Sequence, residues 1–89
     1  MSSIETYNHI ASLTVDLQND FCPGGSLAVA NGDEIIEPMN QLNRWVRQQQ
    51  GKVYFTRDWH PRNSLHFQEN GGEWPRHCIQ YTAGAAFHD

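Results

Sequence analysis

Residues 9–15 alternate between two kinds of side chain, and this alternation predicts the first strand. Leu13 and Val15 fall on one side and hydroxyl side chains on the other, which is the two-residue period of a strand. We expect the strand to end at Asp16, because the chain beyond it contains the turn-forming sequence Pro-Gly-Gly. Residues 1–8 are polar, and we expect them to be frayed.

Residues 33–50 carry the spacing of an amphipathic helix. Acidic residues near the start and arginines toward the end suit the helix dipole. Pro38 lacks a backbone donor and clashes with the preceding turn, so it predicts either a late start or a bend. Gly51 is a natural C-terminal stop. The apolar stripe, at spacings of four, three and four residues, consists of Ile35, Met39, Leu42 and Val46.

A short apolar run at residues 52–55 predicts a second strand. Strand, helix and strand then form one βαβ unit, in which the strands are parallel and the connection is right-handed. In such sheets, ligands collect at the carboxyl ends of the strands. We therefore expect Asp16 and the pair Asp58 and His60 at the same edge. From residue 61 onward the sequence has no periodicity and predicts an extended loop.

The segment after the second predicted strand is rich in side chains that can bind a metal. Asp58 and His60 are two residues apart, so on an extended segment they point to the same side. With His77 they make a three-ligand set that leaves positions open for water or substrate. His66 is either a fourth ligand or a hydrogen-bond partner of a metal-bound water. Zinc, iron and manganese all accept such ligands; the alternative is that these are ordinary polar loop residues.

Other candidate residues have two readings each. Asp16 either caps the turn that follows the strand or carries a proton at the edge of the sheet. Phe21 and Trp74 either flank a flat, uncharged ligand or pack in the core. Nothing basic is arranged to lower the pKa of Cys22 or Cys78, so we expect both thiols to be structural.

Composition excludes several classes of partner. The 89 residues suffice for one small domain, with 38% hydrophobic content, and a mean hydropathy of −0.67. A net charge of −4 with six Lys and Arg leaves no basic surface for nucleic acid. No apolar run approaches the roughly 18 residues needed to span a membrane, and no signal peptide is visible. Two widely spaced cysteines indicate reduced thiols in the cytoplasm.

Taken in order, the motifs resemble the isochorismatase-like cysteine hydrolases, and most closely the nicotinamidases. Each motif is weak alone, but the ordered set is specific and covers nearly the whole chain from residue 15 onward. The matching segments are VDLQNDF at 15–21, PGGSLAV at 23–29, GDEII at 32–36, TRDWHP at 56–61, HF at 66–67, WPRHC at 74–78 and TAGA at 82–85.

The resemblance implies a three-layer (αβα), Rossmann-like α/β fold with a parallel sheet. It also implies hydrolysis of nicotinamide to nicotinic acid and ammonia by an Asp–Lys–Cys triad, with a thioester intermediate. Asp16 matches the triad aspartate, and the cofactor implied is a divalent metal, zinc before iron or manganese, that holds the pyridine nitrogen. The matching metal ligands are Asp58, His60 and His77, with His66 as an additional ligand; the matching ring-binding residues are Phe21, Trp74 and Leu27.

The chain also departs from the family pattern. In the family, the triad lysine and cysteine lie in the second half of the chain. Here the one lysine, Lys52, matches no triad position, and Cys22 and Cys78 stand at other motif positions. We therefore expect residues 1–89 to form a single partial α/β domain, the N-terminal half of such an enzyme, without appreciable turnover alone. The alternatives are a non-catalytic metal-binding module and a chain that pairs with a complementary or full-length chain or with itself.

Overall fold

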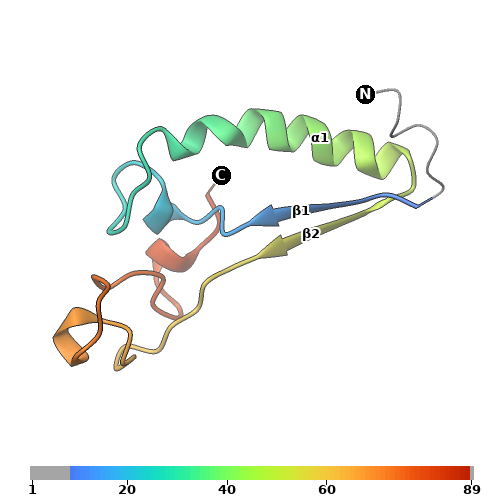
Figure 1. Ribbon diagram of the computed structural model, residues 1–89. Helices are drawn as coiled ribbons and strands as arrows, with labels where there is room; N and C mark the ends of the chain where they lie inside the picture. Colours follow the sequence, from blue (N-terminus) through green and yellow to red (C-terminus); the bar gives the residue numbers. More distant parts are fainter. Residues whose placement is uncertain (1–8, 89) are drawn as a thin grey trace.

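The computed structural model describes residues 9–88, so the expectation of frayed residues 1–8 lies outside the described part. Along the chain come strand β1 (Ala11–Val15), helix α1 (Ile36–Gln48) and strand β2 (Lys52–Thr56) (Figure 1). Around them lie short 3-10 turns rather than one extended loop. These turns are Asn19–Phe21, Gly32–Ile35, Gln68–Asn70 and Ala83–Ala85.

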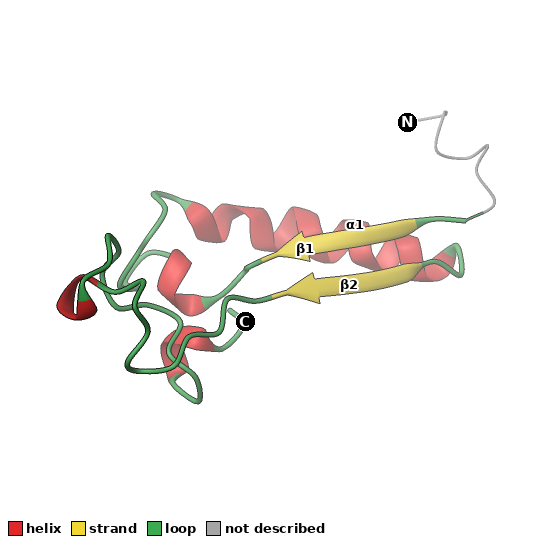
Figure 2. Cartoon of the chain, turned by 60° about the horizontal axis from the view of Figure 1, so that its bottom comes forward, coloured by secondary structure: helices red, strands yellow, loops and turns green. Residues whose placement is uncertain are grey.

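The two strands form a parallel sheet, as the βαβ prediction requires. Their register runs from Ala11 opposite Lys52 to Val15 opposite Thr56. Helix α1 lies along one face of this sheet, and both strands point toward the same end of the molecule (Figures 1 and 2). β1 begins two residues later than predicted and β2 ends one residue later. The carboxyl ends of the strands therefore meet at one edge, from which the loops leave.

Helix α1 is shorter than the predicted 33–50, and Pro38 explains the late start. Residues Gly32–Ile35 form a 3-10 turn, and the regular helix begins at Ile36. Pro38 is then the third helical residue, where an N–H has no partner inside the helix and its loss costs little. At the other end the left-handed residue that follows the helix is Gln50, with a φ of 61°, and not the predicted stop Gly51. Gly51 is instead required by space, because an added Cβ would lie 2.6 Å from the carbonyl oxygen of Ile10.

The contact between α1 and β1 is partly polar. Ser12 and Thr14 are the buried residues of β1, whereas Leu13 and Val15 are 58% and 61% exposed on the opposite face. The Ser12 hydroxyl donates to Asn43 Oδ1 at 2.7 Å, and Asn43 Nδ2 donates to Thr14 Oγ1 at 3.4 Å. Buried hydrogen bonds of this kind satisfy the polar groups that the helix covers.

The molecule is elongated, with extents of 50 × 22 × 21 Å. The strands and α1 make one end, and the loops after β1 and β2 gather at the other (Figure 1). No helix in residues 9–88 combines the length and apolar character needed to cross a bilayer. The site lies in the loop-built end, beyond the carboxyl edge of the sheet.

Candidate metal centre

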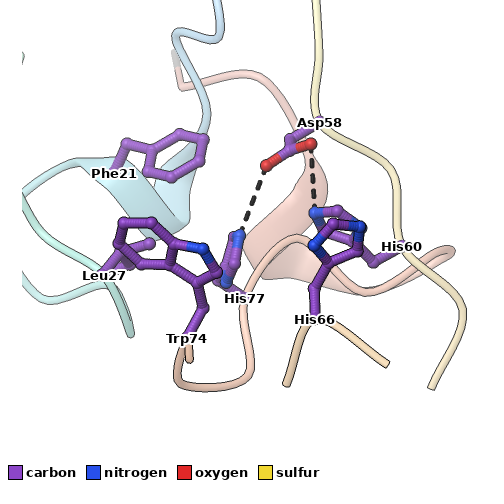
Figure 3. Close-up of a pocket in the computed structure, with 7 residues that line it drawn as sticks. All are labelled: Phe21, Leu27, Asp58, His60, His66, Trp74 and His77. Carbon is purple, nitrogen blue, oxygen red and sulfur yellow. Dashed lines mark ion pairs between the residues drawn. The ribbon is translucent and has the colours of Figure 1, made fainter. Parts of the chain in front are cut away.

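A cavity of about 350 Å³ opens beyond the carboxyl edge of the sheet. Its walls come from the loop after β1 and the long segment after β2. Figure 3 shows the aromatic and aliphatic side chains on one side, imidazoles on the other and a carboxylate above them. The lining residues are Phe21, Leu27, Asp58, His60, His66, Trp74 and His77, seven of the eight site residues predicted from the sequence.

The Asp58 carboxylate lies between two imidazoles. Its Oδ1 is 3.1 Å from His60 Nε2, and its Oδ2 is 3.3 Å from His77 Nε2 (Figure 3). One ligand atom from each of the three residues lies within 4.8 Å of the other two. His66 lines the same cavity with its ring centroid 5.5 Å from that of His60, but it is not part of this three-residue cluster.

The donor set fits a divalent metal. Bonds of about 2.0 Å in a tetrahedron place ligand atoms about 3.3 Å apart, close to the separations around Asp58. His77 Nδ1 is 2.7 Å from the carbonyl oxygen of Pro75, a contact that requires the ring N–H to be on Nδ1. The Nε2 lone pair of His77 is therefore left for a metal, the arrangement that metal-bound histidines usually have.

Two backbone bonds join the segments that carry the ligands. The His60 N–H donates to the carbonyl of Cys78 at 2.9 Å, and the Gln80 N–H donates to the carbonyl of His60 at 2.8 Å. These bonds form a parallel bridge between His60 and Ile79. The two candidate ligands, His60 and His77, are thus held side by side although 17 positions separate them in sequence.

A short loop brings His66 and Trp74 to the same cavity. The Trp74 N–H donates to the carbonyl of His66 at 3.0 Å, and the Gln68 N–H donates to that of Trp74 at 2.7 Å. Gly72 lies so close to the His66 carbonyl that a Cβ would overlap it. Gly72 is therefore needed to close the loop that carries both residues, and Gly71 before it has a left-handed φ of 100° that favours glycine.

Phe21 and Trp74 are not core residues. Trp74 is 51% exposed, and Phe21 is only partly buried. The Phe21 ring is tilted at 52° to the His77 ring with centroids 5.8 Å apart. With Leu27 they form the apolar side of the cavity (Figure 3). Such a wall has the chemical character of a surface for a flat ring, and the ring-binding role of these residues stays a prediction.

Asp16 lies at the same sheet edge but does not line the cavity. Its N–H donates to the carbonyl of Thr56 at 3.1 Å, which continues the strand pairing by one residue. The Thr56 hydroxyl donates to Asp16 Oδ1 at 2.8 Å. Asp16 also has a φ of 53°, in the left-handed region that non-glycine residues seldom adopt. Strain of this kind is common at functional positions.

Neither cysteine has the environment of a nucleophile. Cys22 and Cys78 are both free and buried. Burial, followed by the charge of Asp33, raises the pKa of the Cys22 thiol. Burial is also the main cause that raises the pKa of Cys78 to about 12, with Asp20 the next. These directions agree with a structural role, because the reactive form is the thiolate.

Two residues that hold the ligands were not singled out from the sequence. The Phe67 ring is fully buried and meets the His60 and His77 rings at centroid distances of 5.5 and 5.6 Å. The Gln18 side chain, also fully buried, bonds the backbone of Asp58. Both lie within the motifs that carry the family resemblance, but nothing in residue type or spacing identifies such contacts.

A cavity with ligating groups at the carboxyl ends of parallel strands is where α/β enzymes place their active sites. The chain belongs to the Isochorismatase domain family, whose pattern matches residues 11–89.

Particular relatives agree with this assignment. The nicotinamidase of Escherichia coli strain K12 is 39% identical over 93 residues, which is 88% of this chain and 44% of that protein. The structure of Pyrococcus horikoshii pyrazinamidase in complex with zinc has a TM-score of 0.85 and 47% identity, covering 91% of this chain and 45% of that chain. Yeast nicotinamidase bound to the inhibitor nicotinaldehyde has a TM-score of 0.79 and 30% identity, covering 89% and 48%. The chain spans under half the length of these relatives.

Proposed function

We propose that this chain provides the metal-binding and ring-binding part of a nicotinamidase, an amidohydrolase that converts nicotinamide to nicotinic acid and ammonia. The observation that carries the proposal is the convergence of Asp58, His60 and His77 beside the wall formed by Phe21 and Trp74. The names of the similar proteins, among them nicotinamidases and a zinc-bound pyrazinamidase, support the same substrate class. We place the reaction in the cytoplasm, since both cysteines are free.

In this proposal the substrate ring lies in the cavity between the apolar wall and the ligand cluster. Asp58, His60 and His77 would hold a divalent metal, zinc ahead of iron and manganese, which would supply a Lewis acid for the pyridine nitrogen. Phe21 and Trp74 flank the ring and Leu27 closes the apolar side, while His66 lies beside His60 on the imidazole side of the cavity. These contacts orient the carboxamide and exclude water from the ring faces.

Asp16 is proposed as the proton carrier of the reaction. Its carboxylate would take the proton of a nucleophilic thiol and later pass it to the leaving ammonia. The hydroxyl of Thr56 fixes one carboxylate oxygen, Oδ1. Residues 1–89 contain no lysine or cysteine at the family's triad positions, so the triad would be completed from outside them. We therefore expect no appreciable turnover by the 89-residue chain alone.

Metal binding by the purified chain tests the first part of the proposal. We expect one equivalent of zinc, measured by elemental analysis after gel filtration. The variant His60→Ala should lose it, since two ligands seldom hold zinc. His9→Ala, an exposed histidine outside the site, should keep it. No zinc in the unaltered chain, or equal loss in both variants, would contradict the metal centre.

Ammonia release from nicotinamide tests the second part. The chain alone should be inactive, and mixing it with a polypeptide that supplies the remaining part of a relative's fold should restore activity. Asp16→Ala should abolish the restored activity. The proposal fails if the 89-residue chain alone releases ammonia at enzyme-like rates and Asp16→Ala abolishes that release.

A second candidate is a chain that acts by pairing. The apolar side chains on the open face of the sheet, Leu13 and Val15, favour it, because parallel sheets are normally covered on both faces. A defined complex with a full-length relative in co-purification would support pairing. A monomer that melts cooperatively alone and binds zinc would instead favour a stand-alone metal-binding module.

A further inference from the structure

The side chain of Gln18 brackets the backbone of Asp58. Gln18 is fully buried. Its Oε1 accepts from the Asp58 N–H at 2.8 Å, and its Nε2 donates to the Asp58 carbonyl at 2.8 Å. The same Nε2 donates to the carbonyl of Ala85 at 2.8 Å. The side-chain amide of Gln18 therefore accepts one hydrogen bond and donates two, all of them with backbone groups.

These two hydrogen bonds, the bracket of Gln18 on Asp58, take the place of the pairing with a neighbouring strand that Asp58 lacks. The paired register of β1 and β2 ends at Val15 and Thr56, two residues before Asp58. Backbone N–H and C=O groups away from water need partners, and Gln18 supplies one to each. Fixing both groups of one residue fixes the direction of its Cα–Cβ bond. The carboxylate of Asp58 is thereby aimed at the two imidazoles.

A second contact from the loop after β1, made by Asp20, holds the segment that carries His77. Asp20 Oδ2 accepts from the Cys78 N–H at 2.7 Å, directly after His77. Its Oδ1 accepts from the Ser26 N–H at 3.3 Å. Gly84 packs so closely on this carboxylate that a Cβ would overlap it. The peptide that follows His77 is therefore anchored to the same loop that holds Asp58.

We propose that Gln18 is a positioning residue of the metal centre, acting through the backbone of Asp58, with Asp20 as a second anchor behind His77. The proposal rests on the proposed metal centre. It assigns no contact between Gln18 and the metal or the substrate. Gln18 holds the backbone of Asp58 so that the carboxylate lies within reach of the imidazoles of both His60 and His77.

The neighbouring Asn19 provides a matched control. Its Nδ2 donates to the carbonyl of Ala83 at 2.7 Å, so it joins the same two loops as Gln18 does. Among the described residues, its side chain forms no hydrogen bond with Asp58, His60 or His77. A purely structural loop contact would be removed by either substitution, whereas positioning of a ligand would be removed only at Gln18.

Cobalt(II) is the probe, because its d–d absorption reports the number and arrangement of ligands. In the full chain, Gln18→Met should weaken Co²⁺ binding by about 10- to 100-fold, the usual cost of removing a group that orients a ligand. The bands of the variant saturated with Co²⁺ should also shift in position and intensity. Asn19→Leu should bind within about twofold of the unaltered chain, with unchanged bands.

Two results separate this proposal from the one on which it rests. Unchanged bands and affinity in Gln18→Met, with Co²⁺ bound normally by the unaltered chain, would overturn positioning and leave the metal centre standing. Absence of Co²⁺ binding by the unaltered chain would overturn both.

Hydrogen exchange in the unaltered chain tests the contact without a substitution. The Asp58 N–H should be strongly protected, and exchange at an unprotected rate would overturn the bracket.

Discussion

Cys78 is the residue whose chemistry the fold changes most clearly. It is fully buried, has a φ of 49° and lies directly after His77. Its pKa rises to about 12, first through burial and then through the carboxylates of Asp20, Asp58 and Asp16. A thiol surrounded by acids stays protonated, so this residue contributes packing at the site and no nucleophile.

The raised pKa of Cys78 predicts a loss of stability at alkaline pH. The unfolded chain loses this proton near 9.0, whereas the folded chain keeps it until about 12. Between these values the unfolded state binds fewer protons, so the free energy of unfolding falls as pH rises through the window. Urea unfolding at a series of pH values measures this. Cys78→Ala should flatten the dependence, and an equal slope in both chains would contradict the assignment.

At the scale of elements, α1 and β1 are joined by hydrogen bonds as well as by apolar contact. Asn43 is 4% exposed and bonds both buried hydroxyls of β1. Beside it Val46 is 1% exposed and supplies the apolar part. The bonds connect one helix position with two strand positions, so they fix the position of α1 along the axis of β1.

Replacing Asn43 should therefore destabilise the chain more than replacing an exposed neighbour. Asn43→Ala leaves the hydroxyls of Ser12 and Thr14 buried without this partner, at a cost of about 1–3 kcal/mol. Asn40→Ala, on the exposed side of α1, should change stability by about 0.5 kcal/mol or less. Urea unfolding midpoints compare the two variants. Equal midpoints would mean that the buried bonds contribute nothing beyond helix propensity.

The elements were predictable where a pattern is local. The stripe through Ile35, Met39, Leu42 and Val46 predicted the helix, and alternation predicted the first strand, because both patterns depend on neighbours in sequence. Ile35 was wrongly included, since it lies in the 3-10 turn before α1 and is 48% exposed. The sequence did not show that the helix covers the polar side of β1, because Asn43, which bonds Ser12, lies 31 positions away from it.

The candidate site was predictable to a similar degree. The candidate metal ligands stand out by residue type, and Asp58 and His60 by their spacing as well. The bracket of Gln18 on Asp58 spans 40 positions and uses backbone atoms, so no residue type on either side indicates it. The 3-10 turns after β2 were missed for a related reason, because close approaches such as that of Gly72 to His66 are set by three-dimensional packing.

The whole molecule exposes more surface than its mass would suggest. Its accessible area is 6457 Å², against about 5,300 Å² for a compact monomer of 10.2 kDa. The radius of gyration is 16.0 Å, where about 12 Å is usual for this length. Part of the excess lies on the sheet face opposite α1, where Leu13, Val15 and Tyr54 are more than half exposed.

This open face predicts self-association that polar substitutions should reduce. The double variant Leu13→Thr and Val15→Thr keeps strand propensity and removes apolar surface, so the average mass in sedimentation velocity at high concentration should fall toward the monomer. Val29→Thr, a change at a loop residue that is 59% exposed, should leave the mass as it is. If both chains sediment as the unaltered one does, the sheet face does not drive association.

The joining of His60 and His77 across 17 positions has a mechanical consequence. An ion shared by these residues and Asp58 would act as a cross-link that closes a loop in an end of the molecule built with little regular secondary structure. Because the unfolded chain lacks the assembled site, the binding free energy of such an ion would add to the stability of this end. A chelator would then soften the loop end while the end built by α1 and the two strands kept its rigidity. The two ends of this small chain would differ in their dependence on metal supply.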